Sequence, residues 1–325
     1  MKKHPLLVKK PKIINLESIE NQVDYSDTLP IYARIIEATR CIETGATIET
    51  FEMYFPRPIL AEQNTHRVFS RNTGSSRAIP LKTMLRELRR TPFIPMFWGK
   101  NKSGMQSAET LPWFKAKMCS IAWSIHRVLT FATVKFLSKM DLHKQWANRL
   151  LEPHTYIRQV VTSTSWDNYI TLRHHDDAQP EIVALAYMVK KELATYRADE
   201  YAMYRRVSCT HKKNAFHWHL PYITEEERVE FQHRPLYLAK LSAARCARTS
   251  YLTQEGISPR PEREMGTFKK LAESSPIHAS PLEHQAFPAK KRNRQSRNFI
   301  GFNQYRDYFE NHEHGQPVSE HTEML

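Results

Sequence analysis

The spacing of hydrophobic residues predicts helices in four parts of the chain. Residues 80–92, 179–201 and 262–274 show short helical patterns, and the second opens at Pro180, a favoured first-turn position. Pro153 should end the longest stretch, residues 108–151, because proline cannot continue a helix. In that stretch hydrophobic residues recur every three or four positions with polar residues between, at Trp113, Met118, Ile121, Ile125, Val128 and Leu129.

Strand-like stretches lie between these helices. Residues 49–58 alternate weakly between hydrophobic and polar and are closed by prolines. Residues 156–175 begin strand-like and turn helical around Trp166, whereas residues 235–251 fit a strand or a helix equally well. This mixture predicts an α+β fold, with a mixed sheet and flanking helices.

Length and composition indicate a single large domain. The chain has 325 residues, 41% of them hydrophobic, which is enough for a core. We expect an irregular arm over residues 1–45, one domain over residues 46–310 and a disordered tail over residues 311–325. No apolar run is long enough to span a membrane, and the first residues lack the hydrophobic run of a secretory signal. Four cysteines without a CxxC pair suit a reducing compartment, so we expect a cytoplasmic protein.

The net charge of +14 indicates an anionic partner. That partner is either a nucleic acid or a small phosphorylated ligand, and charge alone does not separate the two. The one dense basic run, residues 290–297, would suit a nucleic acid.

The stretch THRVFSRNTGSSRAIP, residues 65–80, has the chemistry of a phosphate-binding loop. Arginine side chains and hydroxyl groups bind phosphate oxygens, and Gly74 would let backbone N–H groups approach an anion. The alternative is a polar surface loop. The arginines and serines concerned are Arg67, Arg71, Arg77, Ser70, Ser75 and Ser76.

Other candidates each have a structural alternative. Arg149 ends an apolar helical segment, where an arginine can simply pack its stem against the protein. Asn168 and Arg173 lie five residues apart and do not share a helical stripe. A proline turn surrounded by four polar residues can be a helix N-cap, and its residues are His278, Ser280, Glu283 and His284.

Histidine-rich stretches are the candidates for a metal site. Residues 174–177 are adjacent on one element, which favours helix-end roles over shared ligation. His217 and His219 would point to one side of a strand, but no third ligand is identified. We expect no metal site. Cys246 lies in a basic setting and is the one candidate for a catalytic cysteine, with a small buried residue as the alternative.

Taken together, these stretches resemble the flavin-dependent thymidylate synthases of the ThyX type. The family signature is R-H-R-x-x-S-x-N-E-x-S-x-R-Y, and residues 65–78 read T-H-R-V-F-S-R-N-T-G-S-S-R-A. This chain differs from the signature at Thr65, Thr73 and Ala78. It is matched in type and spacing at His66, Arg67, Ser70, Asn72, Ser75 and Arg77.

Four more segments resemble family segments: NRLLEP (residues 148–153), WDNYITLR with DAQPEI (residues 166–182), CARTSY (residues 246–251) and HASPLEH (residues 278–284). In most family members the counterparts of the last two precede the signature, whereas here they follow it. The chain therefore resembles a phage-type branch of the family with circularly permuted motifs, over about residues 45–290.

The resemblance implies two sets of binding residues. It implies that Arg173 and Ser75 are catalytic, with Arg173 facing the pyrimidine carbonyls and stabilising charge that develops there. It implies dUMP binding by Gly74, Ser75, Ser76, Arg77, Arg149 and Arg173. It implies FAD binding by His66, Arg67, Val68, Asn72, Asn168, Ser250, His278, Ser280 and Glu283.

The resemblance also implies an activity. Family members methylate C5 of dUMP to give dTMP, with carbon from 5,10-methylenetetrahydrofolate and hydride from FAD reduced by NADPH, and no enzyme cysteine attacks the pyrimidine. They assemble as homotetramers with sites shared between chains.

The departures at Thr65 and Thr73 leave alternatives open. One is a flavin- and folate-dependent hydroxymethylase with a 5-hydroxymethyl-dUMP or dCMP product. Another is a non-catalytic nucleic-acid-binding relative, although nucleic acid is the less expected partner. A metal-dependent enzyme built on the histidine-rich stretches is the third.

Overall fold

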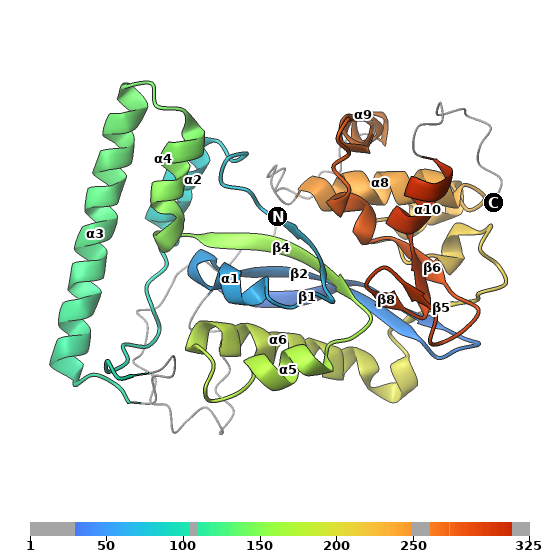
Figure 1. Ribbon diagram of the computed structural model, residues 1–325, viewed down its shortest axis with the longest axis horizontal. Coiled ribbons are helices and arrows are strands. Elements are labelled where there is room, and N and C mark those ends of the chain that lie inside the picture. The colour runs from blue at the N-terminus through green and yellow to red at the C-terminus, as the bar shows by residue number, and fades with distance from the viewer. Residues whose placement is uncertain (1–29, 104–108, 249–260, 273, 314–325) are drawn as a thin grey trace.

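A computed structural model describes residues 30–103, 109–248, 261–272 and 274–313. At its centre lies a five-stranded mixed sheet in the order β3-β4-β2-β1-β5, flanked by helices (Figure 1). The expected α+β fold is therefore confirmed. None of the described helices combines the length and apolar content needed to cross a membrane.

The sheet is built on the hairpin of β1 (Tyr32–Cys41) and β2 (Thr47–Pro56). β4 (Tyr156–Ser163) pairs antiparallel with β2 along its whole length, and β3 (Ser70–Thr73) forms one edge against β4. β5 (Arg205–Val207) forms the other edge and runs parallel to β1.

The expected arm over residues 1–45 is wrong from Tyr32 onward, because that segment is β1. Its sequence, YARIIEATRC, lacks strict alternation since both of its edges are paired and charged residues lie buried in it. Glu37, for example, is neutralised by Arg205 and Arg228 from other segments, with oxygen–nitrogen distances of 3.1 and 2.8 Å. Residues 1–29 and 314–325 lie outside the described part of the chain.

Two helices cover one face of the sheet (Figure 1). They are α5 (Asp167–Arg173) and α6 (Pro180–Arg197), and α6 buries Ile182, Leu185 and Val189 against the strands. Phe51 and Trp166 pack edge to face in the same core, with ring centroids 4.7 Å apart. The predicted switch from strand to helix around Trp166 is confirmed.

The strongest predicted helical stretch forms a hairpin that stands beside the sheet (Figure 1). α3 (Trp113–Lys139) and α4 (Lys144–Leu151) are separated by a turn, and α4 ends before Pro153 as predicted. α2 (Leu81–Arg90) packs with this hairpin through Met84 and Leu88.

The C-terminal part packs around a second core at the far end of the sheet (Figure 1). Residues 235–251, ambiguous by sequence, form α8 (Pro235–Ala247), and the part after residue 248 lies outside the described residues. The remaining helices are α1 (Leu60–Gln63), α7 (Glu225–Glu230), α9 (Pro261–Ala272) and α10 (Tyr305–His312).

Two short ribbons complete this part of the chain. One pairs β6 (Ala286–Pro288) with β9 (Phe302–Gln304), and the other pairs β7 (Gln295–Ser296) with β8 (Phe299–Ile300). The turn before β9 needs Gly301, because its φ is +79° and a Cβ atom at this position would lie 2.5 Å from that of Ala46. Glycine at this position lets the C-terminal ribbons pack onto the β1–β2 hairpin.

Candidate functional site

The signature stretch surrounds the edge strand β3. Antiparallel pairing sets Asn72 opposite Val160 and Ser70 opposite Thr162, which fixes the register of the stretch. Alternation along the strand buries Ser70 and Asn72 and leaves Arg71 partly exposed. The stretch is therefore a strand with a loop at each end, and not a surface loop throughout.

The segment that carries Glu283 lies alongside β3 although it follows it by more than two hundred residues. Gln304 on β9 joins the two, because its Nε2 donates to Ser70 Oγ at 3.2 Å and to the Glu283 carbonyl at 3.3 Å. Asn298 adds a bond from Nδ2 to the Val68 carbonyl at 3.1 Å. The Glu283 carboxylate accepts from Arg306 of α10. The fold thus brings two of the family-like segments together despite their order in the sequence.

Arg173 contacts the start of the signature stretch. Its Nε donates to His66 Nε2 at 2.9 Å, and its Nη2 donates to Thr65 Oγ1 at 2.8 Å and to the Glu62 carbonyl at 3.1 Å. Within the described residues Nη1 makes no hydrogen bond, so it remains a donor for a ligand. α5 positions the guanidinium, since Arg173 is the last residue of that helix.

His66 is held neutral by these surroundings. Its side chain is buried, and its ring meets Tyr169 edge to face at 4.9 Å. Burial, together with the charges of Arg173 and Arg71, lowers the pKa of His66 to about 4. Its Nε2 therefore accepts a hydrogen bond from Arg173 at neutral pH, and the proton lies on Nδ1.

α4 supports the other end of the stretch. The fully buried Asn148 donates from Nδ2 to the carbonyls of Ser76 and Ile79 at 2.7 and 2.8 Å. Arg149, the next residue, is exposed, as is Arg77 in the loop. Two predicted phosphate ligands thus lie on neighbouring elements that are tied together by Asn148.

Gly74 and Ser76 are occupied by the protein itself. The Gly74 N–H donates to the Arg158 carbonyl at 2.9 Å, and the Gly74 carbonyl accepts from Arg57 Nη1 at 3.4 Å. The expected contact between the Gly74 amide and an anion is thus not available in this conformation. Ser76 is buried, which leaves Ser75 and Arg77 as the accessible members of the loop.

Buried hydroxyl and imidazole groups link three strands behind β3. Hydrogen bonds of 2.7–2.8 Å join the His219 ring to Thr39 and Thr50, Thr50 to Thr162, and Thr162 to His284 Nδ1. Burial lowers the pKa of His284 to about 3.

The expectation that His217 and His219 point to one side of a strand is wrong. His217 lies in a 3-10 turn and accepts the Ser208 N–H at 3.0 Å, whereas His219 enters the sheet. The two rings therefore do not converge on one ion.

Cys246 is not an activated nucleophile. It is fully buried in α8, and burial raises the pKa of its thiol. The alternative interpretation of a small buried residue therefore holds.

The predicted flavin ligands differ in burial and in their contacts. Asn72 fits a polar ligand, because its buried Nδ2 has no hydrogen-bond partner among the described residues. Asn168 and His278 are exposed and make no hydrogen bond to the signature stretch within the described part of the chain. The remaining predicted ligands include the exposed Arg67, Val68 and Ser280, the partly buried Glu283, and Ser250, which lies outside the described residues.

Sequence reasoning missed the residues that hold this site in place. Gln304 carries no motif signal, and Asn148, the first residue of the NRLLEP segment, was assigned no role there. Arg57, buried behind Gly74 with Glu152 at 3.8 Å, has only adjacent prolines to mark it.

The arrangement suits a small phosphorylated ligand. Arg67 precedes β3 and Arg77 follows it, and the same stretch holds serine hydroxyl groups and the neutral His66. Phosphate and carbonyl oxygens accept hydrogen bonds from groups of this kind. No model of a known protein family matches the chain, and no curated protein matches it.

Comparison with solved structures gives matches of low identity. A UMP/dUMP methylase, PolB of Streptomyces cacaoi, crystallised with 5-Br UMP, matches with a TM-score of 0.44 and 14% identity over 52% of this chain and 90% of its own. The flavin-dependent thymidylate synthase ThyX of Helicobacter pylori, crystallised with FAD and dUMP, matches with a TM-score of 0.29 and 19% identity over 46% of this chain and 70% of its own. A second ThyX structure from the same organism, with FAD and dUMP, matches with a TM-score of 0.30 and 20% identity over 48% of this chain and 74% of its own.

Proposed function

We propose that the protein is a ThyX-like, FAD-dependent enzyme that transfers a one-carbon unit to C5 of dUMP and gives dTMP. The observation that carries the proposal is the hydrogen bond from Arg173 to His66. It joins a residue that the motifs assign to the nucleotide with one that they assign to the flavin, from segments 107 residues apart. An enzyme that brings a pyrimidine and a flavin together needs such a junction.

Arg173 has two roles in this proposal. Its bonds to His66 and Thr65 fix the guanidinium plane, and its Nη1 is left to face a carbonyl of the pyrimidine. Charge that develops on the ring during reaction is then stabilised by a cation already in position. His66, being neutral, leaves the positive charge of Arg173 uncompensated.

The phosphate of dUMP would be bound at the other end of β3. Arg77 and Arg149 are exposed there, and Ser75 is partly exposed. Charge-assisted hydrogen bonds of this type contribute roughly 1.5–3 kcal/mol each. Asn148 keeps the loop and the helix in register, so that both arginines can reach one phosphate.

FAD fits the residues around β3. When bound, the flavin supplies hydride, which no amino-acid side chain can do, and NADPH would reduce it. Asn72 would donate its unpartnered Nδ2 to the cofactor, together with the other predicted flavin ligands Arg67, Val68 and Glu283. Methylenetetrahydrofolate would bring the carbon. Ser75 would position the substrate.

The two departures from the family signature have structural roles here. Thr65 accepts a bond from Arg173, and Thr73 Oγ1 accepts one from Gln159 at 2.7 Å. Neither supplies the charge of the family residue it replaces. A hydroxymethylated product, from dUMP or dCMP, is therefore the second candidate outcome of the same one-carbon chemistry.

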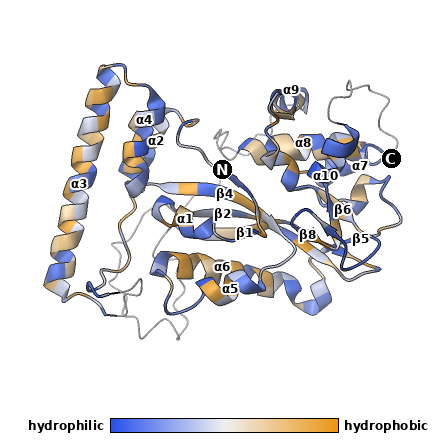
Figure 2. Ribbon diagram, in the orientation of Figure 1, coloured by the Kyte–Doolittle hydropathy of each residue, from blue (hydrophilic) through white to orange (hydrophobic). Residues whose placement is uncertain are grey.

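The exposed face of α3 supports an assembly of several chains, which we propose is a homotetramer. Figure 2 shows hydrophobic residues along this helix, and large exposed apolar patches mark interaction sites. A symmetric pair of such faces would bury them against each other. Seven large hydrophobic residues on this helix are between 44% and 62% exposed: Phe114, Met118, Ile121, Ile125, Val128, Leu129 and Phe136.

The test is an absorption spectrum of the purified protein with added FAD, repeated with dUMP and then with dCMP. Bound flavin whose bands shift with dUMP, followed by dTMP formation when methylenetetrahydrofolate and NADPH are added, is the expected result. Protein that stays colourless with FAD contradicts the proposal. A shift with dCMP alone, or a hydroxymethyl product, selects the second candidate.

Nucleic-acid binding is tested on the same preparation. Residues 290–294 form an exposed basic turn between β6 and β7, which is the observation in its favour. DNA affinity that falls steeply with salt, in protein that binds no flavin, would identify that function instead.

A further inference from the structure

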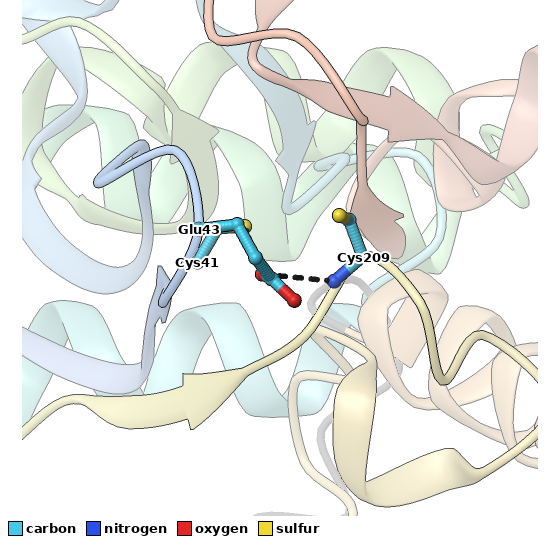
Figure 3. A group of neighbouring side chains, drawn as sticks. All are labelled: Cys41, Glu43 and Cys209. Atoms are coloured by element: carbon cyan, nitrogen blue, oxygen red, sulfur yellow. Dashed lines mark hydrogen bonds between the residues drawn. The ribbon is translucent and has the colours of Figure 1, made fainter.

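We propose that Cys41, Glu43 and Cys209 bind a zinc ion. Cys41 is the last residue of β1, Glu43 follows in the turn toward β2, and Cys209 comes shortly after β5 (Figure 3). Their two sulfur atoms and a carboxylate oxygen all lie within 4.8 Å of one another. The parallel pairing of β1 with β5, which sets Cys41 opposite Val207, brings the two cysteines to the same end of the sheet.

The donor set has the chemistry that zinc prefers. Thiolates bind Zn²⁺ at about 2.3 Å and carboxylate oxygens at about 2.0–2.2 Å, in tetrahedral geometry. Donor atoms on one tetrahedral ion therefore lie about 3.3–3.8 Å apart. Side-chain movements of about 1 Å would bring these three donors onto one ion. Thiolates select zinc over magnesium and calcium, which take oxygen ligands.

The carboxylate is already hydrogen-bonded to both cysteines, through the thiol of Cys41 and the backbone N–H of Cys209. Glu43 Oε2 accepts from Cys41 Sγ and from the Cys209 N–H, both at 3.2 Å. Its other oxygen accepts from the Ser208 hydroxyl, which also hydrogen-bonds Thr210 Oγ1 at 2.7 Å. Partners of this kind orient the ligands of metal sites.

Access and apolar packing complete the site. Cys41 is fully buried beside Ile48 and Val207, whereas Cys209 is partly exposed and Glu43 is exposed. An ion can therefore enter from the Glu43 side, where a water molecule would take the fourth position. His217 is excluded as the fourth ligand while its Nδ1 accepts the Ser208 N–H.

Zinc at this position would fasten an edge of the sheet. β5 has only three residues, and its parallel pairing with β1 is its one strand contact among the described residues. Bonds from β1 through the ion to the segment after β5 would keep β5 paired with β1. Because the ion binds the folded chain, it would also raise the melting temperature.

The test uses the full-length protein, dialysed against Zn²⁺ and then against metal-free buffer. We expect one zinc per chain in the wild type and in Cys119→Ser, a matched control whose cysteine lies in α3. Cys41→Ser and Cys209→Ser should bind none, and Glu43→Gln should bind at least about tenfold more weakly. Co²⁺ in place of zinc should give thiolate charge-transfer absorption in the wild type and the control, and none in the two serine variants.

Several results would overturn the proposal. They are a wild type without stoichiometric zinc, zinc content unaffected by both cysteine substitutions, or a Cys41–Cys209 disulfide that excludes the ion. If circular dichroism shows that the serine variants do not fold, the zinc affinity of Glu43→Gln becomes the test of the proposal. Affinity equal to that of the wild type would then rule out ligation by this carboxylate.

Discussion

Asn148→Asp tests whether the nucleotide loop is held by α4. Asparagine and aspartate have nearly the same shape, but only asparagine can donate to the carbonyls of Ser76 and Ile79, which it now does at 2.7 and 2.8 Å. Leaving a buried acceptor without its donor costs about 1–3 kcal/mol, so two such carbonyls amount to about 2–6 kcal/mol. The buried carboxylate adds a further cost, since it would face two carbonyl oxygens. This is a large share of the roughly 5–15 kcal/mol that stabilises a typical domain.

The assay is urea unfolding followed by circular dichroism, paired with dUMP affinity from the flavin spectrum. Arg149→Gln is the matched control on the next residue, because its side chain is exposed. We expect Asn148→Asp to lose both stability and affinity, and Arg149→Gln to lose affinity while keeping its stability. Wild-type stability in Asn148→Asp would refute the proposed support of the loop. Wild-type affinity in Arg149→Gln would refute its role as a phosphate ligand.

Four further results are expected. Burial lowers the pKa of His66 to about 4 and that of His284 to about 3, so the unfolded chain binds more protons below pH 6.5. The free energy of unfolding should therefore fall as pH drops from about 6.5 toward 4, and a flat urea-unfolding profile across that window would contradict this. Arg173→Lys should lower kcat/KM for dUMP about 10- to 100-fold, because an ammonium cannot make the same fork of bonds; unchanged turnover would remove its proposed role. Ile125→Glu on α3 should shift the assembly to smaller species in light scattering, and a wild-type mass would exclude this face as the interface. Gly301→Ala should destabilise by about 1–3 kcal/mol, since alanine is strained at φ +79° and its Cβ would clash; an unchanged melting temperature would argue against that strain.

Local patterns in the sequence predicted the helices better than the sheet. The stretch over residues 108–151 has a helical period that needs no partner to be recognised, and it forms α3 and α4. β1 was missed because its alanine, glutamate and arginine residues are typical of helices. Pairing with β2 and β5, and the buried charge pairs of Glu37, override that local preference.

The site was also predicted only as far as local patterns allow. Motifs identified His66 and Arg173, but only the fold shows that they touch. Gln304 and the cluster of Cys41, Glu43 and Cys209 could not be predicted, because their partners lie in distant segments and no spacing rule connects them. Short-range chemistry is readable from one sequence, whereas long-range proximity requires the topology.

The bond from Gln304 to Ser70 has a consequence for how the protein is made. These residues lie 234 positions apart, and the later one is on β9. On the ribosome, β3 therefore emerges long before the residue that holds it to the Glu283 segment. The nascent chain cannot complete the site until β9 has been translated, and contacts of such long sequence separation form slowly. A chain that stops before β9 should leave the ribosome with most of its sheet but without an assembled site.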